Sequence, residues 1–186
     1  MRRRILSLFM ALVMLFTLLP LNALADEPTP GSAHLISSAE QLAEFAKAVS
    51  AGTAYEGEYF KLTEDVIYNG SPIGALNAAP FKGVFDGDGH SVTVNINTGD
   101  SCAALFPDAI GATIMNLEIR GTISGTNSVG GVVGLARNNT LIYNCHVAAS
   151  VTGSAENVGG IVGMLYDGCT VSNCRVDGTV RGGIAK

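Results

Sequence analysis

The chain has 186 residues, of which 47% are hydrophobic and only 6% aromatic, and its formal net charge is −5. The acidic balance argues against a nucleic-acid partner, because neutralising phosphates requires a basic surface. A mild acidic charge chiefly supports solubility.

Residues 1–25 have the three-part plan of a secretory signal peptide. Three arginines precede an apolar run of 17 residues, and an Ala-Leu-Ala sequence follows that ends at Ala25. We therefore expect export with cleavage between Ala25 and Asp26. An uncleaved membrane anchor is the alternative, because 17 residues approach a spanning length. Cleavage would leave eight basic and sixteen acidic residues, hence a net charge of −8, and no membrane span.

A linker and one helix are expected next. The Pro- and Gly-containing start of residues 26–36 is typical of a linker. Ser38 and Gln41 form a capping box at the start of residues 37–52, where we expect a helix over residues 39–50. Its apolar stripe recurs at i, i+3, i+4 and i+7, at Leu42, Phe45, Ala46 and Val49. Such a stripe needs a surface to cover, so we expect the helix to cap one end of the following fold.

Residues 53–100 are expected to form irregular first coils of a β-rich fold, with strands in "EYFKLTEDVIY", "FKGVFDG" and "HSVTVNI". Asp86 and Asp88 alternate with glycines between the last two strands. This spacing resembles a calcium loop, but the twelfth position is Asn97 where an EF-hand loop needs glutamate. We favour a tight turn, because Asp-Gly is itself a turn former.

Residues 101–186 contain a tandem repeat. Residues 126–153 align with residues 155–182 at an offset of 29, with 10 identities in 28 positions. A fainter copy lies upstream at an offset of 28, with "CAALF" in the place of "GGVVG". The expected coils span about 101–125, 126–154 and 155–182. Self-similarity at such a period is typical of solenoids and propellers.

Each repeat unit holds short apolar stretches between Gly, Asp, Asn and Ser residues, and none has a helical period over 10 to 12 residues. Three strands in about 28 residues suffice for one turn of a parallel β-helix but not for a four-stranded propeller blade of about 40 residues. The sequence therefore predicts an all-β parallel β-helix, or β-solenoid, with a short N-terminal capping α-helix.

The repeats also resemble a known family. "GGVVG" at residues 130–134 and "GGIVG" at residues 159–163 are each followed by Asn-Cys about ten residues later, which resembles the GLUG-motif repeats of bacterial secreted and surface proteins. "FKGVFDGDGHSVTVNI" and "ISSAEQLAEFAKAVSAG" are similar to the lead-in that often precedes such repeats. The resemblance implies a right-handed β-helix in a bacterial extracellular protein, with an adhesive or unknown role. It implies no chemistry.

One aligned position of the repeat is always asparagine. Equivalent residues of successive coils stack about 4.8 Å apart, so we expect Asn116, Asn144 and Asn173 to form a ladder. Asparagine amides can bond to one another and to the turn backbone. A polar row that binds a ligand is the alternative, but a structural ladder needs no partner.

The next position holds Leu117, Cys145 and Cys174. A leucine at this position indicates that the ladder faces the core, so we expect both cysteines to be buried. Stacking near 4.8 Å exceeds the Cβ separation of about 3.8 Å in a relaxed disulfide, so we expect free thiols. We expect no metal site and no cofactor, since the three histidines have no metal-ligand spacing from a cysteine.

The glycines of the repeat are expected to serve turns with positive φ or a close approach of coils. They stand at residues 130, 131, 134, 159, 160 and 163. No basic residue follows either cluster, which argues against a phosphate site.

The residues shared between repeats all have structural roles, whereas charged residues vary. His146 becomes Arg175, and Asn138 becomes Asp167. We therefore expect a non-enzymatic adhesion or interaction module, secreted or on the cell surface, that binds a glycan or protein there.

A polysaccharide-active enzyme, or its carbohydrate-binding part, is the alternative function. Charged side chains converging on one face would favour it. The candidates are Asp86, Asp88, Arg120, Asp167 and Arg175. The closing "RGGIAK" resembles the start of another coil, so we expect a fragment of a longer protein or self-association through an open C-terminal coil.

Overall fold

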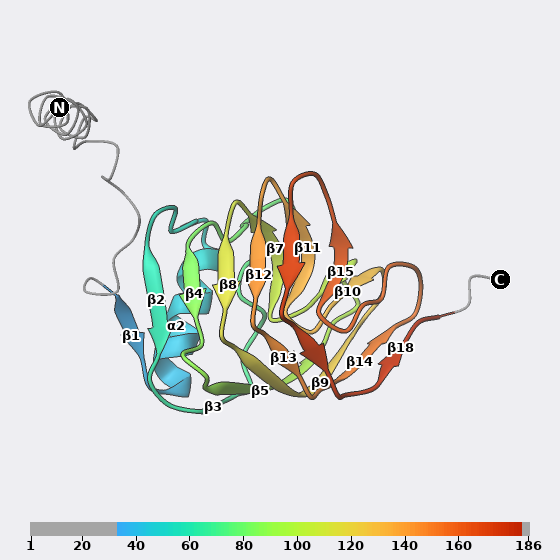
Figure 1. Cartoon of the computed structure of the whole chain (residues 1–186), viewed down its shortest axis with the longest axis horizontal. Coiled ribbons are helices and arrows are strands. Elements are labelled where there is room, and N and C mark those ends of the chain that lie inside the picture. The colour runs from blue at the N-terminus through green and yellow to red at the C-terminus, as the bar shows by residue number, and fades with distance from the viewer. Residues whose placement is uncertain (1–32, 184–186) are drawn as a thin grey trace, which may run out of the picture.

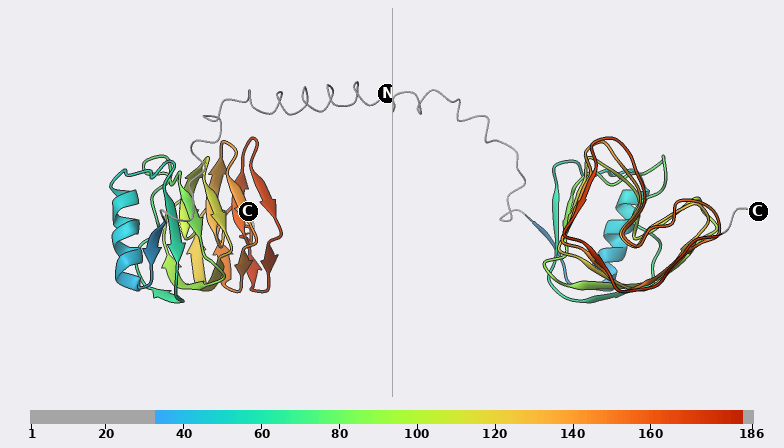
Figure 2. Two further views of the ribbon diagram at one scale, coloured as in Figure 1. Left: turned by 60° about the vertical axis from the view of Figure 1, so that its left-hand side comes forward. Right: turned by 45° about the vertical axis from the view of Figure 1, so that its right-hand side comes forward.

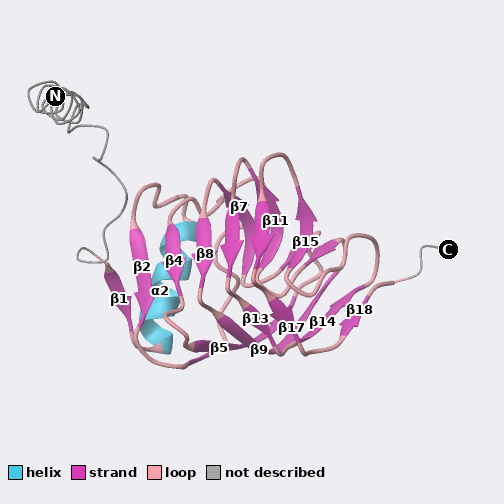
Figure 3. Ribbon diagram, in the orientation of Figure 1, coloured by secondary structure: helices cyan, strands magenta, loops and turns pink. Residues whose placement is uncertain are grey.

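The computed structural model describes residues 33–183, which form a parallel β-solenoid of about five turns with one helix (Figures 1 and 3). The coils wind right-handed from the N-terminal to the C-terminal end (Figure 1). The predicted fold class is confirmed. The expected signal peptide and its Ala25–Asp26 cleavage site lie outside the described residues.

Three parallel sheets run along the solenoid. Sheet A consists of β1 (His34–Ile36), β2 (Tyr59–Leu62), β4 (Val84–Asp86), β8 (Thr113–Met115), β12 (Leu141–Tyr143) and β16 (Thr170–Ser172). Sheet B consists of β3 (Val66–Tyr68), β5 (Ser91–Asn97), β9 (Glu118–Gly125), β13 (His146–Val147), β14 (Ser150–Gly153), β17 (Arg175–Val176) and β18 (Val180–Arg181). Sheet C consists of β7 (Phe106–Ile110), β11 (Val133–Arg137) and β15 (Val162–Leu165), and β6 (Cys102–Ala103) pairs with β10 (Ser128–Val129).

Aliphatic and aromatic side chains form ladders inside the coils. Alternate residues of a strand point to opposite faces, so one or two residues per short strand face the interior. The inward ladder of sheet A consists of Phe60, Phe85, Ile114, Ile142 and Val171. That of sheet B includes Val66, Val92, Ile119, Val147 and Val176. The first four members of each ladder are buried.

Helix α2 (Ala39–Ser50) covers the N-terminal end of the solenoid (Figure 2). Its side chains at Leu42, Phe45, Ala46 and Val49 join the buried core, as the stripe predicts. The Ser38 hydroxyl accepts a hydrogen bond from the Gln41 amide at 3.3 Å. The Gln41 side chain reaches one residue further back than expected and accepts from the Ser37 amide at 2.7 Å.

The expected linker over residues 26–36 is wrong at its end. His34–Ile36 forms strand β1, which pairs in parallel with β2. Ile36 is buried in the core, and the His34 ring stacks on Phe60 with ring centroids 4.8 Å apart. Burial of Ile36 and pairing with β2 therefore recruit three residues that have no turn signals of their own.

The expected register of the first repeat is wrong by one residue in sheet C. Phe106 pairs with Val133, an offset of 27, whereas Thr113 pairs with Leu141, an offset of 28. The second coil has one more residue in the intervening turn, so "CAALF" does not align with "GGVVG". The later offset of 29 is confirmed in all three sheets.

The repeat glycines serve close approach and not positive φ. A Cβ at Gly131 would lie 2.4 Å from the Gly160 carbonyl oxygen and 2.7 Å from the Val147 methyls. A Cβ at Gly134 would lie 2.7 Å from the Pro107 carbonyl oxygen. Left-handed φ values fall instead on other glycines and on asparagines, among them Asn116, Asn144 and Asn173.

The last described coil is more exposed than the others. Leu165, Val176 and Val180 are 47%, 37% and 42% exposed. Because Arg181 pairs with Thr152, the following Gly182 stands at the place of Gly153 and not at that of the "GG" pair. The resemblance of "RGGIAK" to the start of a coil is therefore out of register.

Candidate functional site

In every repeat coil, an asparagine forms the turn between sheets A and B. Asn116, Asn144 and Asn173 have φ values of 53°, 50° and 52°. Asparagine tolerates this left-handed region better than most residues with a side chain. The Asn144 amide nitrogen donates to Asn116 Oδ1 at 2.9 Å. Asn173 occupies the same turn in the next coil.

Asp86 stands at the head of this amide row. Its Oδ1 accepts from the Asn116 side-chain amide at 2.9 Å, and its Oδ2 accepts from the Tyr59 hydroxyl at 2.5 Å. Burial and the neighbouring Asp86 carboxylate raise the pKa of Tyr59 to about 12. The sequence singled out Asp86 for an Asp-Gly turn and as a candidate charged residue but did not predict this bond. Asp86 pairs with Met115 and so stands one residue before the place of Asn116.

Asp88 points to a different partner. Its carboxylate forms a 2.9 Å ion pair with Lys61, and its backbone has φ of 50° in a tight turn with Gly89. The Gly87 carbonyl accepts from the His90 amide at 2.8 Å across this turn. The two aspartates thus serve the turn and its neighbours, and among residues 33–183 no group of three potential metal ligands is found.

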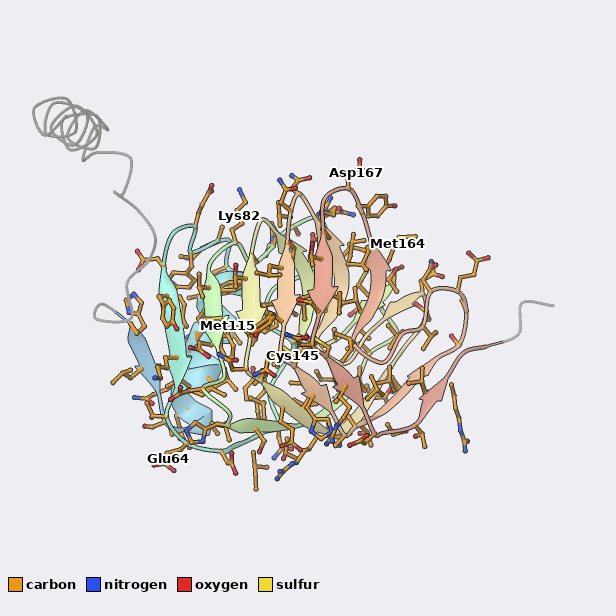
Figure 4. All side chains as sticks on the ribbon, in the orientation of Figure 1. Glu64, Lys82, Met115, Cys145, Met164 and Asp167 are labelled. Carbon is orange, nitrogen blue, oxygen red and sulfur yellow. The ribbon has the colours of Figure 1, made fainter. Side chains whose placement is uncertain are left out.

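Cys145 and Cys174 follow the corner asparagines and face inward. Cys145 is 1% exposed and Cys174 is half-buried (Figure 4 labels Cys145 inside the solenoid). The Cys145 amide donates to Cys174 Sγ at 3.4 Å, and both thiols are free. Burial raises the pKa of Cys145 to about 12. A thiol of this kind is a core residue rather than a nucleophile.

Charged side chains line up on the outer face of sheet B beside the corner. Glu118, His146 and Arg175 are neighbours in successive strands. His146 Nε2 lies 3.0 Å from Asp177 Oδ2, and its Nδ1 lies 3.6 Å from Glu118 Oε1. Asp177 also pairs with Arg175 at 2.7 Å.

Arg120 completes this charged cluster. Its Nε donates to Glu118 Oε1 at 2.8 Å and its second nitrogen donates to Oε2 at 3.1 Å, a bidentate pair. The Arg120 hydrogen bond is the main reason that the pKa of Glu118 is lowered. Glu118 is therefore held as a carboxylate.

An open depression of about 330 Å³ lies between the asparagine corner and this cluster. It is lined by Asp88, Gly89, Asn116, Leu117, Glu118, Asn144 and His146. Its walls thus combine amide, carboxylate and imidazole groups.

Two polar rows, uncharged except for Arg181, continue across the outer face of sheet B. One row contains Asn95, Thr122, Ser150 and Thr179, and the other contains Asn97, Ser124, Thr152 and Arg181. The Thr122 hydroxyl donates to Asn95 Oδ1 at 2.8 Å, and the Thr179 hydroxyl donates to Ser150 Oγ at 2.9 Å. In the second row, the Ser124 hydroxyl donates to Asn97 Oδ1 at 3.0 Å. We call these two rows and the adjacent charged cluster the polar face.

The candidate charged residues are only partly brought together. Arg120 and Arg175 join the charged cluster, and Asp86 and Asp88 lie at its edge. Asp167 lies at the opposite turn, between β15 and β16 (Figure 4). The charged cluster also contains Glu118 and Asp177, which the sequence analysis did not select. Glu118 lies two residues from Arg120, and Asp177 lies two residues from Arg175. A spacing of two places both side chains on the same side of a strand, so it could have indicated these ion pairs.

The chain is similar to known proteins in its repeat motif and in its fold. A family model described as the GLUG motif matches residues 154–181, which confirms the resemblance seen in the repeats. No curated protein sequence matches the chain. In the described residues, no helix has the length and apolarity required to cross a membrane.

One solved structure with a similar fold is a Bacteroides ovatus protein described as a candidate immunoglobulin A1 protease. The two share 18% identity with a TM-score of 0.55, over 83% of this chain and 60% of that chain. At this identity the likeness shows the fold alone. The chain spans about 60% of the length of that structure.

Proposed function

The chain carries the GLUG motif on a β-solenoid, and from this premise we propose that it is a non-enzymatic binding module of a bacterial extracellular surface. Its polar face binds an extended cell-surface glycan. The extracellular location is supported by the GLUG motif and by the signal peptide that the sequence predicts.

The observation that carries this proposal is the coil-to-coil register of the polar face. Thr122, Ser150 and Thr179 present hydroxyls at the same place in three successive coils. Neighbouring strands lie about 4.8 Å apart, so the row repeats at a short fixed interval. A hydroxyl that donates its single proton to a neighbour keeps acceptor lone pairs for a ligand.

A glycan chain also repeats hydroxyl groups along its length, so several weak contacts can form at once. Linked contacts of this kind gain strength from effective concentration rather than from any one strong bond. The proposed binding is therefore weak per sugar and stronger for longer chains.

One observation favours the enzyme alternative. Glu118 and Asp177 both approach His146, so carboxylates from two different coils converge on one imidazole. Glycoside cleavage needs one carboxyl with a raised pKa to act as general acid. Arg120 lowers the pKa of Glu118, which opposes that role and favours binding.

The test is a glycan and host-protein binding array on the chain from Asp26 to Lys186. We expect binding to a subset of glycans, with tighter binding to longer oligomers of the same sugar. Binding to proteins alone would contradict the glycan proposal.

A parallel assay measures reducing sugars and unsaturated products across a polysaccharide panel. We expect no product from any polysaccharide. Product formation that is abolished in Glu118→Gln or Asp177→Asn, but kept in Thr170→Ala on sheet A, would make the enzyme alternative the better account.

A further inference from the structure

A second depression lies at the N-terminal end of the solenoid, away from the polar face. It has a volume of about 530 Å³ and lies between strand β1, helix α2 and the turn that precedes β2. Small-molecule sites have volumes of roughly 300 to 1,000 Å³ and are mostly apolar with a few placed polar groups. We call this depression the aromatic groove.

Aromatic rings line the groove. Phe60 lies 4.3 Å from Phe45 and 4.7 Å from Tyr55, measured between ring centroids. The His34 ring stacks on Phe60 from strand β1. Rings from the helix, the turn and two strands therefore meet at one place.

Tyr55 adopts a backbone conformation that is unfavourable for a large side chain. Its φ is 54°, in the left-handed region that bulky residues rarely occupy. The turn is held by a hydrogen bond from the Glu58 amide to the Tyr55 carbonyl at 3.1 Å, and by one from the Lys82 amide to the Ala54 carbonyl at 2.8 Å. Strain of this kind concentrates at ligand-binding sites, and here it directs an aromatic ring to the groove.

Carboxylates surround the rings. Glu40 and Glu44 of the helix line the groove, and Glu58 bonds to His34 Nε2 at 2.8 Å. Hydrogen bonds from its own backbone amide and from Ser38 lower the pKa of Glu40, so its carboxylate stays charged. The helix lysine, Lys47, lines a different depression with Tyr68.

We propose that the aromatic groove binds the alkylated ammonium group of an organic cation. Aromatic rings attract such cations, and here the partly exposed Tyr55 ring and the exposed His34 ring would meet the ligand above the buried Phe45 and Phe60. The carboxylates of Glu40 and Glu44 add a complementary charge that repels anions. An apolar neutral ligand would use the rings but not the carboxylates.

This inference does not depend on the proposed glycan binding. The groove is built from β1, β2 and α2, whereas the polar face begins at β5 and extends to β18. Loss of one site should leave the other unchanged.

The test compares choline with its neutral carbon isostere, 3,3-dimethylbutan-1-ol, on the chain from Asp26 to Lys186. Amide chemical shifts are followed during titration with each compound. We expect choline to shift Tyr55, Phe60 and their neighbours, and to bind at least about fivefold more tightly than the isostere. Equal affinities, or shifts confined to other parts of the chain, would overturn the proposal.

Two variants make the test specific. Glu44→Gln removes one exposed carboxylate with little effect on folding, and we expect choline affinity to fall about threefold while isostere affinity is unchanged. Lys47→Gln is the control on the same helix, and choline affinity should not fall. If Glu44→Gln binds choline as tightly as the unmodified chain, the carboxylates do not select the ligand and the proposal fails.

Discussion

At the scale of single residues, asparagine has two roles at the corner between sheets A and B. Its backbone accepts a left-handed turn, and its amide donates a hydrogen bond to the preceding coil. Asn144 has φ of 50° and donates to Asn116 at 2.9 Å. Asparagine supplies both properties with one short side chain, which explains its presence beside core residues.

Replacing Asn144 separates these roles. We expect Asn144→Ala to lower the free energy of unfolding by about 1 to 3 kcal/mol, because it loses the amide bond and strains the turn. Asn144→Gly loses the amide but favours positive φ, so it should cost less. Urea unfolding midpoints measure both changes. An unchanged midpoint in Asn144→Ala would show that the ladder contributes nothing.

Cys145 is expected to be chemically inert in the folded protein. Burial raises its pKa to about 12, so almost no thiolate is present at pH 8. We expect a thiol reagent to modify Cys169 much faster than Cys145, as followed by mass spectrometry of the unreduced protein. Equal rates in the native state, or a Cys145–Cys174 disulfide, would contradict the stacking.

The same pKa has a consequence for stability. The pKa of Cys145 is raised above its ordinary value of 9.0, so burying the neutral thiol stabilises fully below pH 9 and loses this contribution as pH rises toward 12. Tyr59 adds a loss in the same direction above pH 10. Stability should therefore decline on the alkaline side, and less steeply in Cys145→Ala.

The corner asparagines and the core cysteine could be predicted from the sequence, because each recurs in aligned repeats. The bond of Asp86 to Asn116 could not, because the coil of Asp86 lies outside the detectable repeat and Asp86 stands one residue before the asparagine position. The approach of Glu118 and Asp177 to His146 also escaped, since a charge pattern predicts an exposed strand but not which side chains of other coils lie beside it.

At the scale of elements, close contact between coils depends on glycines with ordinary φ. Gly131 packs on Gly160 and Val147 where the chain turns inward between sheets B and C. A side chain there would separate two coils.

Gly131→Ala should therefore destabilise the fold. Its Cβ would lie 2.4 Å from a backbone oxygen that cannot move aside cheaply, and overpacking of this kind costs about 1 to 3 kcal/mol. Gly99→Ala is the matched control, because its Cβ would have no neighbour within 4 Å. Thermal unfolding compares the two. Similar melting temperatures would show that the coils can separate at Gly131 without cost.

The helix and the strands of the early coils could be predicted because apolar periodicity and capping residues are local signals. Strand β1 and the one-residue shift at Phe106 could not. Both depend on pairing with distant strands, which sequence spacing alone does not fix.

At the scale of the whole molecule, the last described coil exposes apolar side chains and strand edges. Val180 is 42% exposed, and nothing in residues 33–183 pairs with the outer side of β18. Such edges pair readily with other chains. We propose that the chain from Asp26 to Lys186 self-associates through this coil.

Sedimentation velocity tests this proposal. We expect a concentration-dependent dimer that is weakened in Val180→Lys. Ile67→Lys changes an aliphatic residue that is 70% exposed at the other end of sheet B, and it should leave the dimer intact. A stable monomer at high concentration, or equal weakening by both variants, would contradict association through the last coil.

The central claim is that the polar face binds a glycan through aligned hydroxyls. The most direct measurement is the affinity of the best glycan from the array for three proteins: the unmodified chain, Thr122→Arg with Ser150→Arg, and Thr170→Arg on the outer face of sheet A. Arginines in the hydroxyl row block it sterically, whereas the exposed Thr170 lies on a different face. We predict at least about a tenfold loss in the double variant and no loss in Thr170→Arg, with unfolding midpoints showing that all three fold. Full affinity in the double variant, or equal losses in both variants, would contradict the claim.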